Sequence, residues 1–214
     1  MFPWVRHLDR RVSLWNGFLF KSFEPEEYVR QRYAETIAEV PVLEGEENLE
    51  AKRREMFYLN MNWFMASLLE RKDRMSMAAG LEIRVPYADH RLVEYVWNIP
   101  WEMKTHGGMP KGILRYAMKG ILPDDVLYRK KSPYPKTHHP NYTQAVQTWL
   151  MDILNNPSSP IHSVINLSTA RKIFASTGGL FNDPFFGQLM QGAQMMAYLI
   201  QLNTWMDEYK VQIK

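Results

Sequence analysis

The sequence contains no cysteine, and this absence excludes several kinds of chemistry at once. The chain can form no disulfide, no zinc site built on thiolates and no covalent intermediate on a cysteine nucleophile. Such a composition suits a reducing compartment, so we expect a cytoplasmic protein.

Long apolar runs and a strong excess of one charge are also missing. No run approaches the roughly 20 apolar residues that a membrane-spanning helix needs, and residues 1–11 lack the apolar stretch of a signal peptide. The net charge is only +3, whereas chains that bind nucleic acids usually show a stronger basic bias. We therefore expect no membrane association and no nucleic-acid partner.

Helical periodicity dominates what remains, and 46% of the residues are hydrophobic, which is enough for a packed core. Strand patterns are few: "LEIRVP" at 81–86 is an extended candidate, and "FLF" near residue 18 is a weaker one. The pattern predicts a mainly α, irregular multi-helix bundle that forms a single domain over 1–214. We expect helices over 25–40, 48–77, 89–99, 111–119, 140–155, 168–176 (ended by Gly178 and Gly179) and 183–211.

The stretch "RKKSPYPK" at 129–136 carries four cations and no acid. Pro133 and Pro135 keep it out of a helix and stiffen it. Taken alone, the stretch is either a solvated basic turn or a loop that binds an anion. RNA binding fits poorly, because single-strand binders interleave several aromatics with cations over a broad face, and here Tyr134 is the one aromatic residue.

A second charged segment follows the helix predicted over 48–77. Glu82 and Arg84 are two residues apart, so in an extended segment both side chains point to the same side. Pro86 favours extended backbone before it, and Asp89 can cap the next helix. We expect Glu82, Arg84 and Asp89 to form a structural ion network at this corner.

Two other groups are weak candidates for a site. His138 and His139 are adjacent, so their side chains diverge, and no third ligand stands at metal-binding spacing. We therefore expect no metal site. We expect the apolar group in the last predicted helix to belong to the core and not to a ligand pocket: Met195, Met196, Tyr198 and Trp205.

Residues 73–100, "DRMSMAAGLEIRVPYADHRLVEYVWNIP", resemble a signature of the glutamine-dependent asparagine synthetases and their β-lactam-forming relatives. Tyr87 and Ala88 stand where many relatives have Phe-Leu, which changes packing only. The resemblance covers most of the chain, because it continues through "GGMPKGILRYAM" at 107–118, "LPDDVLYRKKSPYPK" at 122–136 and "LIQLNTWMDEY" at 199–209.

The resemblance implies a reaction and a set of residues. Such enzymes use ATP to activate the side-chain carboxylate of aspartate as an adenylate, with release of pyrophosphate, and ammonia derived from glutamine then displaces AMP. Lys131 matches the family lysine that stabilises the departing pyrophosphate, as a fixed cation can. The resemblance also implies that four further residues bind substrate or ATP, although Asp73 and Arg74 could equally form ion pairs: Asp73, Arg74, Lys111 and Arg129.

Other parts of the family pattern are absent from this sequence. It has no Ser-Gly-Gly-x-Asp-Ser phosphate loop, and "STGGLFND" at 176–183 is a poor substitute because it has one residue too many and follows a helical pattern. The Gly-Glu-x-x-Asp-Glu segment and the cysteine of the glutaminase are also missing. The resemblance thus implies the C-terminal helical half of an adenine-nucleotide α-hydrolase-like synthetase domain.

We expect this half to be inactive alone. ATP and Mg²⁺ would be substrates of the full enzyme and would not stay bound to this fragment, and its partners would be an upstream α/β half and a glutaminase domain. Two alternatives remain: a non-catalytic helical module that self-associates through an exposed apolar face, and a subunit of a split amidoligase. The product could be asparagine, a β-lactam or another amide.

Overall fold

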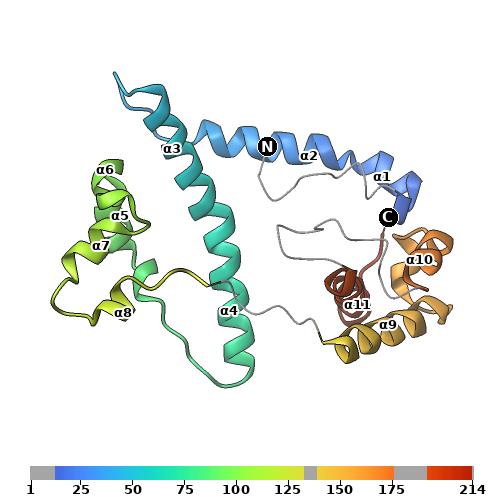
Figure 1. The fold of residues 1–214 in the computed structure, drawn as a ribbon. Coiled ribbons are helices and arrows are strands. Elements are labelled where there is room, and N and C mark those ends of the chain that lie inside the picture. Colours follow the sequence, from blue (N-terminus) through green and yellow to red (C-terminus); the bar gives the residue numbers. More distant parts are fainter. Residues whose placement is uncertain (1–12, 133–138, 176–191, 214) are drawn as a thin grey trace. The chain divides into compact units, whose positions relative to one another are not determined.

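The structure, a computed structural model, describes residues 13–132, 139–175 and 192–213. These residues are mostly helical and contain no strand, only two isolated bridges that join Trp15 to Ile165 and Lys119 to Leu122. The mainly α fold is therefore confirmed (Figure 1). The described helices include none that is long and apolar enough to cross a bilayer.

Both strand candidates fail to form a strand. Residues 81–85 are extended but pair with no other segment in the described chain. The weaker candidate is helical, because "FLF" lies within α1 (Gly17–Phe23). Asn16 caps this helix by accepting a hydrogen bond from the backbone N–H of Phe18 at 3.1 Å, which starts a helix where the apolar residues alone suggested a strand.

The chain divides into two compact units. The first comprises residues 1–38 and 135–214, and the second comprises residues 39–134. Each unit is described separately below, and the single domain expected over 1–214 stays a prediction.

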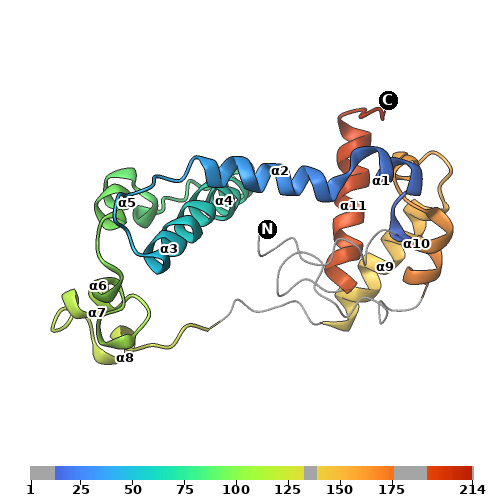
Figure 2. The same cartoon turned by 90° about the horizontal axis from the view of Figure 1, so that it is seen from above.

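The first unit has a closed hydrophobic core. It contains α1, α2 (Pro25–Ala38), α9 (Pro140–Asn155), the 3-10 turn η5 (Pro160–Ser163), α10 (Leu167–Phe174) and α11 (Gly192–Glu208). Figures 1 and 2 both show α9, α10 and α11 side by side. Their apolar faces meet in one cluster, whose fully buried members include Leu14, Leu150, Leu154, Ile161, Phe174, Met196 and Leu199.

Polar contacts fix how the helices of this unit end. Gln147 in α9 donates to the carbonyl of Phe174 at 2.8 Å, and Arg171 in α10 donates to the carbonyl of Leu154 at 2.7 Å. Met195 and Met196 are buried, as expected for core residues, whereas Trp205 is half exposed, so its assignment to the core is wrong. It lines a hollow of about 570 Å³ together with Tyr142 and Trp149 of α9.

The second unit is built around one long helix. The chain runs from α3 (Asn48–Leu59) through a π-helical turn η2 (Asn60–Met65) into α4 (Ala66–Ala78), as predicted over 48–77. Six short helical segments follow, none longer than eight residues: η3 (Pro86–Ala88), α5 (His90–Trp97), α6 (Trp101–Lys104), η4 (His106–Gly108), α7 (Gly112–Ala117) and α8 (Asp124–Leu127).

Most sequence boundaries agree with these helices. The predicted helix over 140–155 coincides with α9, and Asp89 caps α5 as expected. Three expectations lie outside the described residues: the glycine stop at 178–179, the part of the last helix over 183–191, and the "STGGLFND" stretch.

Candidate functional site

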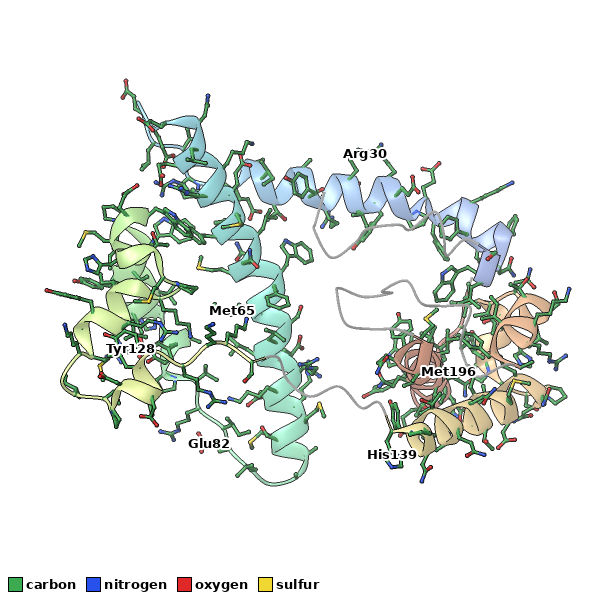
Figure 3. The ribbon with its side chains drawn as sticks, viewed as in Figure 1. Arg30, Met65, Glu82, Tyr128, His139 and Met196 are labelled. Atoms are coloured by element: carbon green, nitrogen blue, oxygen red, sulfur yellow. The ribbon has the colours of Figure 1, made fainter. Side chains whose placement is uncertain are left out.

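The described site residues all belong to the second unit. Glu82 and Arg84 lie on the extended stretch after α4, where Figure 3 labels Glu82, and Arg84 Nε is 2.9 Å from Glu82 Oε1. The shared side predicted from their spacing is thus observed. Both side chains are largely exposed, at 84% for Arg84 and 64% for Glu82, so the ion pair is solvated and not buried.

Asp89 pairs with a different partner. It caps α5 by accepting from the Arg91 N–H at 2.9 Å, while the Arg91 guanidinium lies 2.6 Å from Asp89 Oδ2. The hydrogen bonds from the Arg91 side chain, and then from its backbone, lower the pKa of Asp89 to about 2. The corner therefore holds two separate ion pairs in the described residues, and no bond joins Asp89 to Glu82 or Arg84.

Asp73 and Arg74 diverge at the end of α4. The Arg74 guanidinium turns back along the helix and pairs with Glu70 at 2.5 Å. Asp73 instead lines a small hollow of about 390 Å³ with Ile83 and Val85 of the extended stretch. Lys72 donates to the Ile83 carbonyl at 2.9 Å and thereby ties that stretch to α4.

Lys111 lies in a tight backbone turn immediately before α7. Its backbone is left-handed, with φ of 60°, and it precedes Gly112. A Cβ on Gly112 would lie 2.2 Å from the carbonyl oxygen of His106, so only glycine fits there. Lys111 borders an apolar groove of about 780 Å³ that includes Phe64, Leu68 and residues of α5.

The basic loop is described over residues 129–132, and the rest of it, with His138, lies outside the described residues. Figure 3 labels Tyr128, where the chain leaves α8 to enter this loop. Arg129 and Lys131 are exposed. The carbonyl of Arg129 accepts from Arg115 Nη2 at 3.2 Å, so the start of the loop is attached to α7.

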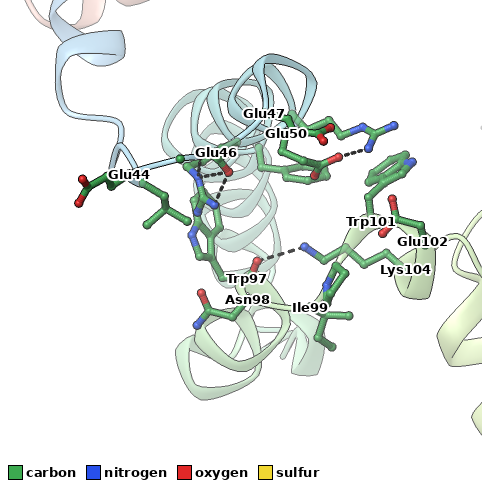
Figure 4. A pocket seen from close by; sticks show the side chains of 16 residues that line it. Glu44, Glu46, Glu47, Glu50, Trp97, Asn98, Ile99, Trp101, Glu102 and Lys104 are labelled. Atoms are coloured by element: carbon green, nitrogen blue, oxygen red, sulfur yellow. Dashed lines mark hydrogen bonds and ion pairs between the residues drawn. The ribbon is translucent and has the colours of Figure 1, made fainter.

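A further pocket of about 470 Å³ lies between the link 43–47, α3, α5 and α6 (Figure 4). Two ion pairs join charged side chains that line it. Arg54 binds Glu46 through Nε and Nη2, with both side chains mostly buried, and this pairing raises the pKa of Arg54. Arg53 pairs with Glu50.

Aromatic rings complete this pocket. The guanidinium of Arg53 lies 4.8 Å from the ring centre of Trp101, and Lys104 Nζ lies 5.0 Å from that of Phe57. Lys104 also donates to the Trp97 carbonyl at 3.2 Å, a bond drawn in Figure 4. Burial lowers the pKa of Lys104, and nearby Arg54 lowers it further. We interpret these contacts as the links that hold α3 to α5 and α6.

Sequence reasoning missed Arg115, which binds the start of the basic loop to α7, and Arg91, which pairs with Asp89. Arg115 stands four residues after Lys111, one helical turn on, and this spacing was the signal available for it. Arg91 stands two residues after a helix cap. His139 caps α9, since its Nδ1 accepts from the Asn141 N–H at 3.3 Å. The described residues contain no group of three or more His, Asp or Glu side chains that could hold a metal ion.

Comparison with known proteins shows which family this chain resembles. The family description "Asparagine synthase" matches residues 1–207. Asparagine synthetase [glutamine-hydrolyzing] 3 of Bacillus subtilis is 53% identical over 212 residues, which is 99% of this chain and 34% of that protein. Asparagine synthetase [glutamine-hydrolyzing] 1 of the same organism is 35% identical over 46% of this chain and 16% of its own length.

A more distant relative shows the same partial coverage. The asparagine synthetase [glutamine-hydrolyzing] of Mesocricetus auratus is 27% identical over 56% of this chain and 21% of its own length. The chain thus spans about a third or less of the length of each of these relatives. Its similarity to the first of them nevertheless extends over nearly every residue. The chain belongs to the asparagine synthase family.

Proposed function

We propose that the chain is the helical part of an ATP-dependent asparagine synthetase and that it supplies one side of the synthetase active site. The observation that carries this proposal is the 53% identity over 99% of the chain to a glutamine-hydrolysing asparagine synthetase. The proposed substrates are aspartate, ATP with Mg²⁺, and ammonia released from glutamine.

The proposed reaction has two steps. A side-chain carboxylate oxygen of aspartate attacks the α-phosphorus of ATP, and the bond to the β-phosphate oxygen breaks to release pyrophosphate. The nitrogen of ammonia then bonds to the acyl carbon, the carbon–oxygen bond to AMP breaks, and asparagine, AMP and a proton leave. The first step builds negative charge on pyrophosphate, so a cation held beside it lowers the barrier.

Lys131 is proposed to be that cation. It is exposed, and it lies two residues beyond a backbone carbonyl that Arg115 holds. Lys111 and Arg129 are proposed to bind the phosphates, since both are exposed cations on segments anchored to α7. Asp73, beside its hollow, is proposed to face the substrates, whereas the pairing of Arg74 with Glu70 favours a structural role for that arginine.

We propose that the chain is inactive alone, because the phosphate loop of the family is missing from its sequence. Its partners would then be an upstream α/β half and a glutaminase domain. The test is pyrophosphate release that depends on aspartate and ammonia, measured with this chain alone and again with the upstream segment of a relative supplied. We expect no pyrophosphate release from this chain alone and measurable release when the two are combined.

Lys131→Ala should lower the recovered rate by about 10²–10³-fold, the usual loss when a stabilising group at a developing charge is removed. Lys21→Ala is the matched control, because Lys21 is an exposed lysine of α1 that the proposal leaves out of the site. Robust turnover by this chain alone would contradict the need for a partner. Equal rates for Lys131→Ala and the wild type would remove the proposed role of Lys131.

One observation favours a second candidate, a helical interaction module. The second unit exposes many large apolar side chains, among them Trp63, Phe64, Leu68, Tyr87 and Met75. Apolar area of this kind favours self-association or docking to another chain. The distinguishing measurement is sedimentation of the isolated chain: a concentration-dependent oligomer without recovered activity supports the module, and a monomer with recovered activity supports the ligase.

A further inference from the structure

Arg115, a half-buried residue of α7, makes an unusual set of bonds for an arginine. Its Nε donates to the carbonyl of Pro110 at 3.0 Å, Nη1 donates to the carbonyl of Leu127, and Nη2 donates to the carbonyl of Arg129 at 3.2 Å. Its partners are therefore three backbone carbonyls. In the described part of the chain no carboxylate pairs with it.

The chemistry of the guanidinium suits this arrangement. Its donors lie in one rigid plane, so a single side chain can bind carbonyls from two segments at once. α8 is a helix of four residues, and the carbonyls at and after its end have no helical partners of their own. Two of these, from Leu127 and Arg129, receive the Arg115 donors, which is how a basic side chain stabilises a helix end.

The contacts of Arg115 restrict where the cations of the basic loop can lie. The side chain of Leu127 is buried, so the segment is anchored before the loop begins. The Arg129 carbonyl is held two residues further on, and Lys131 follows two residues after that. An extended chain advances roughly 3.3–3.6 Å per residue, so the Cα of Lys131 lies within about 7 Å of the Cα of Arg129, whose carbonyl is held.

α7, the helix that carries Arg115, also fixes the position of Lys111. The backbone N–H of Arg115 donates to the Lys111 carbonyl at 3.0 Å, in the first turn of α7. The close approach of Gly112 to His106 holds that end of α7 against η4. One helix therefore carries Lys111 at its start and, one turn later, the side chain that holds the loop leading to Lys131.

We propose that Arg115 is a positioning residue: by binding the carbonyls of Leu127 and Arg129, it orders the start of the basic loop and sets where Lys131 stands relative to Lys111. The ordering of the loop is a property of this chain alone, whereas its effect on the rate rests on the proposed function. Arg115 itself is not proposed to touch a substrate.

The first test measures order without activity. In hydrogen–deuterium exchange on this chain, Arg115→Ala and Arg115→Lys should raise the exchange rate of the Tyr128 and Arg129 amides, which donate to the carbonyls of Asp124 and Val126, by about tenfold or more. Arg115→Lys keeps the charge but cannot bridge carbonyls from two segments, so it should resemble the alanine variant. The amides of α9 and α11 should be unchanged, and Arg30→Ala, which removes an exposed arginine of α2, should change neither region.

The second test measures catalysis by the chain combined with the upstream segment of a relative. A misplacement of about 1 Å can cost about 10²-fold in rate, so kcat of both Arg115 variants should fall by about that factor. KM for aspartate should stay within twofold of the wild-type value. Added guanidinium should restore part of the rate of Arg115→Ala and none of Lys131→Ala.

The outcomes separate the two proposals. Unchanged exchange of the Tyr128 and Arg129 amides in both variants would overturn the positioning role, and so would a wild-type kcat. If Arg115→Ala opened the whole unit, Arg115→Lys would decide, with local opening supporting the role and native exchange refuting it. Faster exchange of these two amides, with no pyrophosphate release even by the combined wild type, would refute the proposed function and leave the ordering role intact.

Discussion

The two units of this chain differ in how many of their apolar side chains they bury. The first unit gathers its apolar residues into a closed cluster between α9, α10 and α11, with Phe174 and Leu150 fully buried. The second unit is as rich in aromatic and aliphatic residues, yet its buried hydrophobic side chains are Val40, Leu59 and Leu127 among the described residues. All the described candidate site residues lie in this second unit.

This contrast separates a region that can be stable by packing from a region held largely by polar links. In the second unit, Arg54, Lys72 and Arg115 each join two segments through ion pairs or backbone carbonyls. Such contacts are directional and can fix a geometry, but each contributes only about 1 kcal/mol net, or about 1.5–3 kcal/mol where a charge is involved. The geometry of the site should therefore be specific but easily disturbed.

The largest effect should come from the core of the first unit. Phe174→Ala removes a fully buried ring and should lower the free energy of unfolding by about 3–5 kcal/mol. Chemical denaturation followed by tryptophan fluorescence would measure it, since the seven tryptophans of the chain include Trp149 and Trp205 of this unit. Phe18→Ala is the matched control, because Phe18 is 80% exposed and should cost little. Equal losses at the two positions would contradict a closed core.

The next effect should come from Gly112 in the second unit. Gly112→Ala places a Cβ against the backbone of His106, so α7 must move, and overpacking of this kind costs about 1–3 kcal/mol. The movement should also displace Lys111 and Arg115 and lower the recovered synthetase rate. Both quantities would be measured on the same variant, by denaturation and by pyrophosphate release.

Gly17→Ala provides the control for this prediction. Gly17 lies in the first turn of α1 with open space around its Cα, so an added methyl group should be neutral or slightly stabilising. A stable Gly112→Ala variant with the wild-type rate would show that the corner before α7 tolerates a side chain, and the tight approach to His106 would then lose its importance.

A smaller effect should come from the Glu46–Arg54 ion pair in the pocket of Figure 4. Glu46→Gln keeps the shape of the side chain but leaves the mostly buried Arg54 without its charged partner, which should cost about 1–2 kcal/mol. The control is Glu27→Gln, whose partner Arg30 is exposed in α2 and whose loss should cost at most about 1 kcal/mol. If both variants cost the same, the burial of the Glu46 pair would have no energetic consequence.

The sequence predicted helices in both units where the signals are local. α9 and the long helix from α3 to α4 follow from apolar periodicity and capping residues, which are local signals. The capping role of Asp89 and the shared side of Glu82 and Arg84 were also local, and both were found. "FLF" was misassigned because the Asn16 cap outweighs a short apolar run.

The links that organise the site could not be predicted in this way. Arg115 reaches carbonyls 12 and 14 residues away, and Arg54 reaches a carboxylate eight residues away. No periodicity encodes such partners, since they depend on how the intervening turns fold. The resemblance supplied Lys131 and Lys111 as residues, but the arginine that connects their segments required the structure.

The smallest effect should be the response of the α5 cap to acid. In the folded chain the pKa of Asp89 is about 2, below its ordinary value of 3.8, because the Arg91 hydrogen bonds favour the carboxylate. A carboxylate with a lowered pKa contributes its stabilisation fully above pH 3.8, and this contribution disappears as the pH falls toward 2. The first turn of α5 should therefore loosen in that window and not at neutral pH.

NMR titration of the Arg91 and Leu92 amides between pH 5 and 2 would detect this change. Asp89→Asn should abolish the titration while keeping the helix start, because asparagine caps a helix about as well as aspartate. A midpoint at the ordinary value would show that Arg91 does not hold the carboxylate in solution. The second unit would then lack one of the polar links that, in place of a core, define the shape of the corner beside the candidate site.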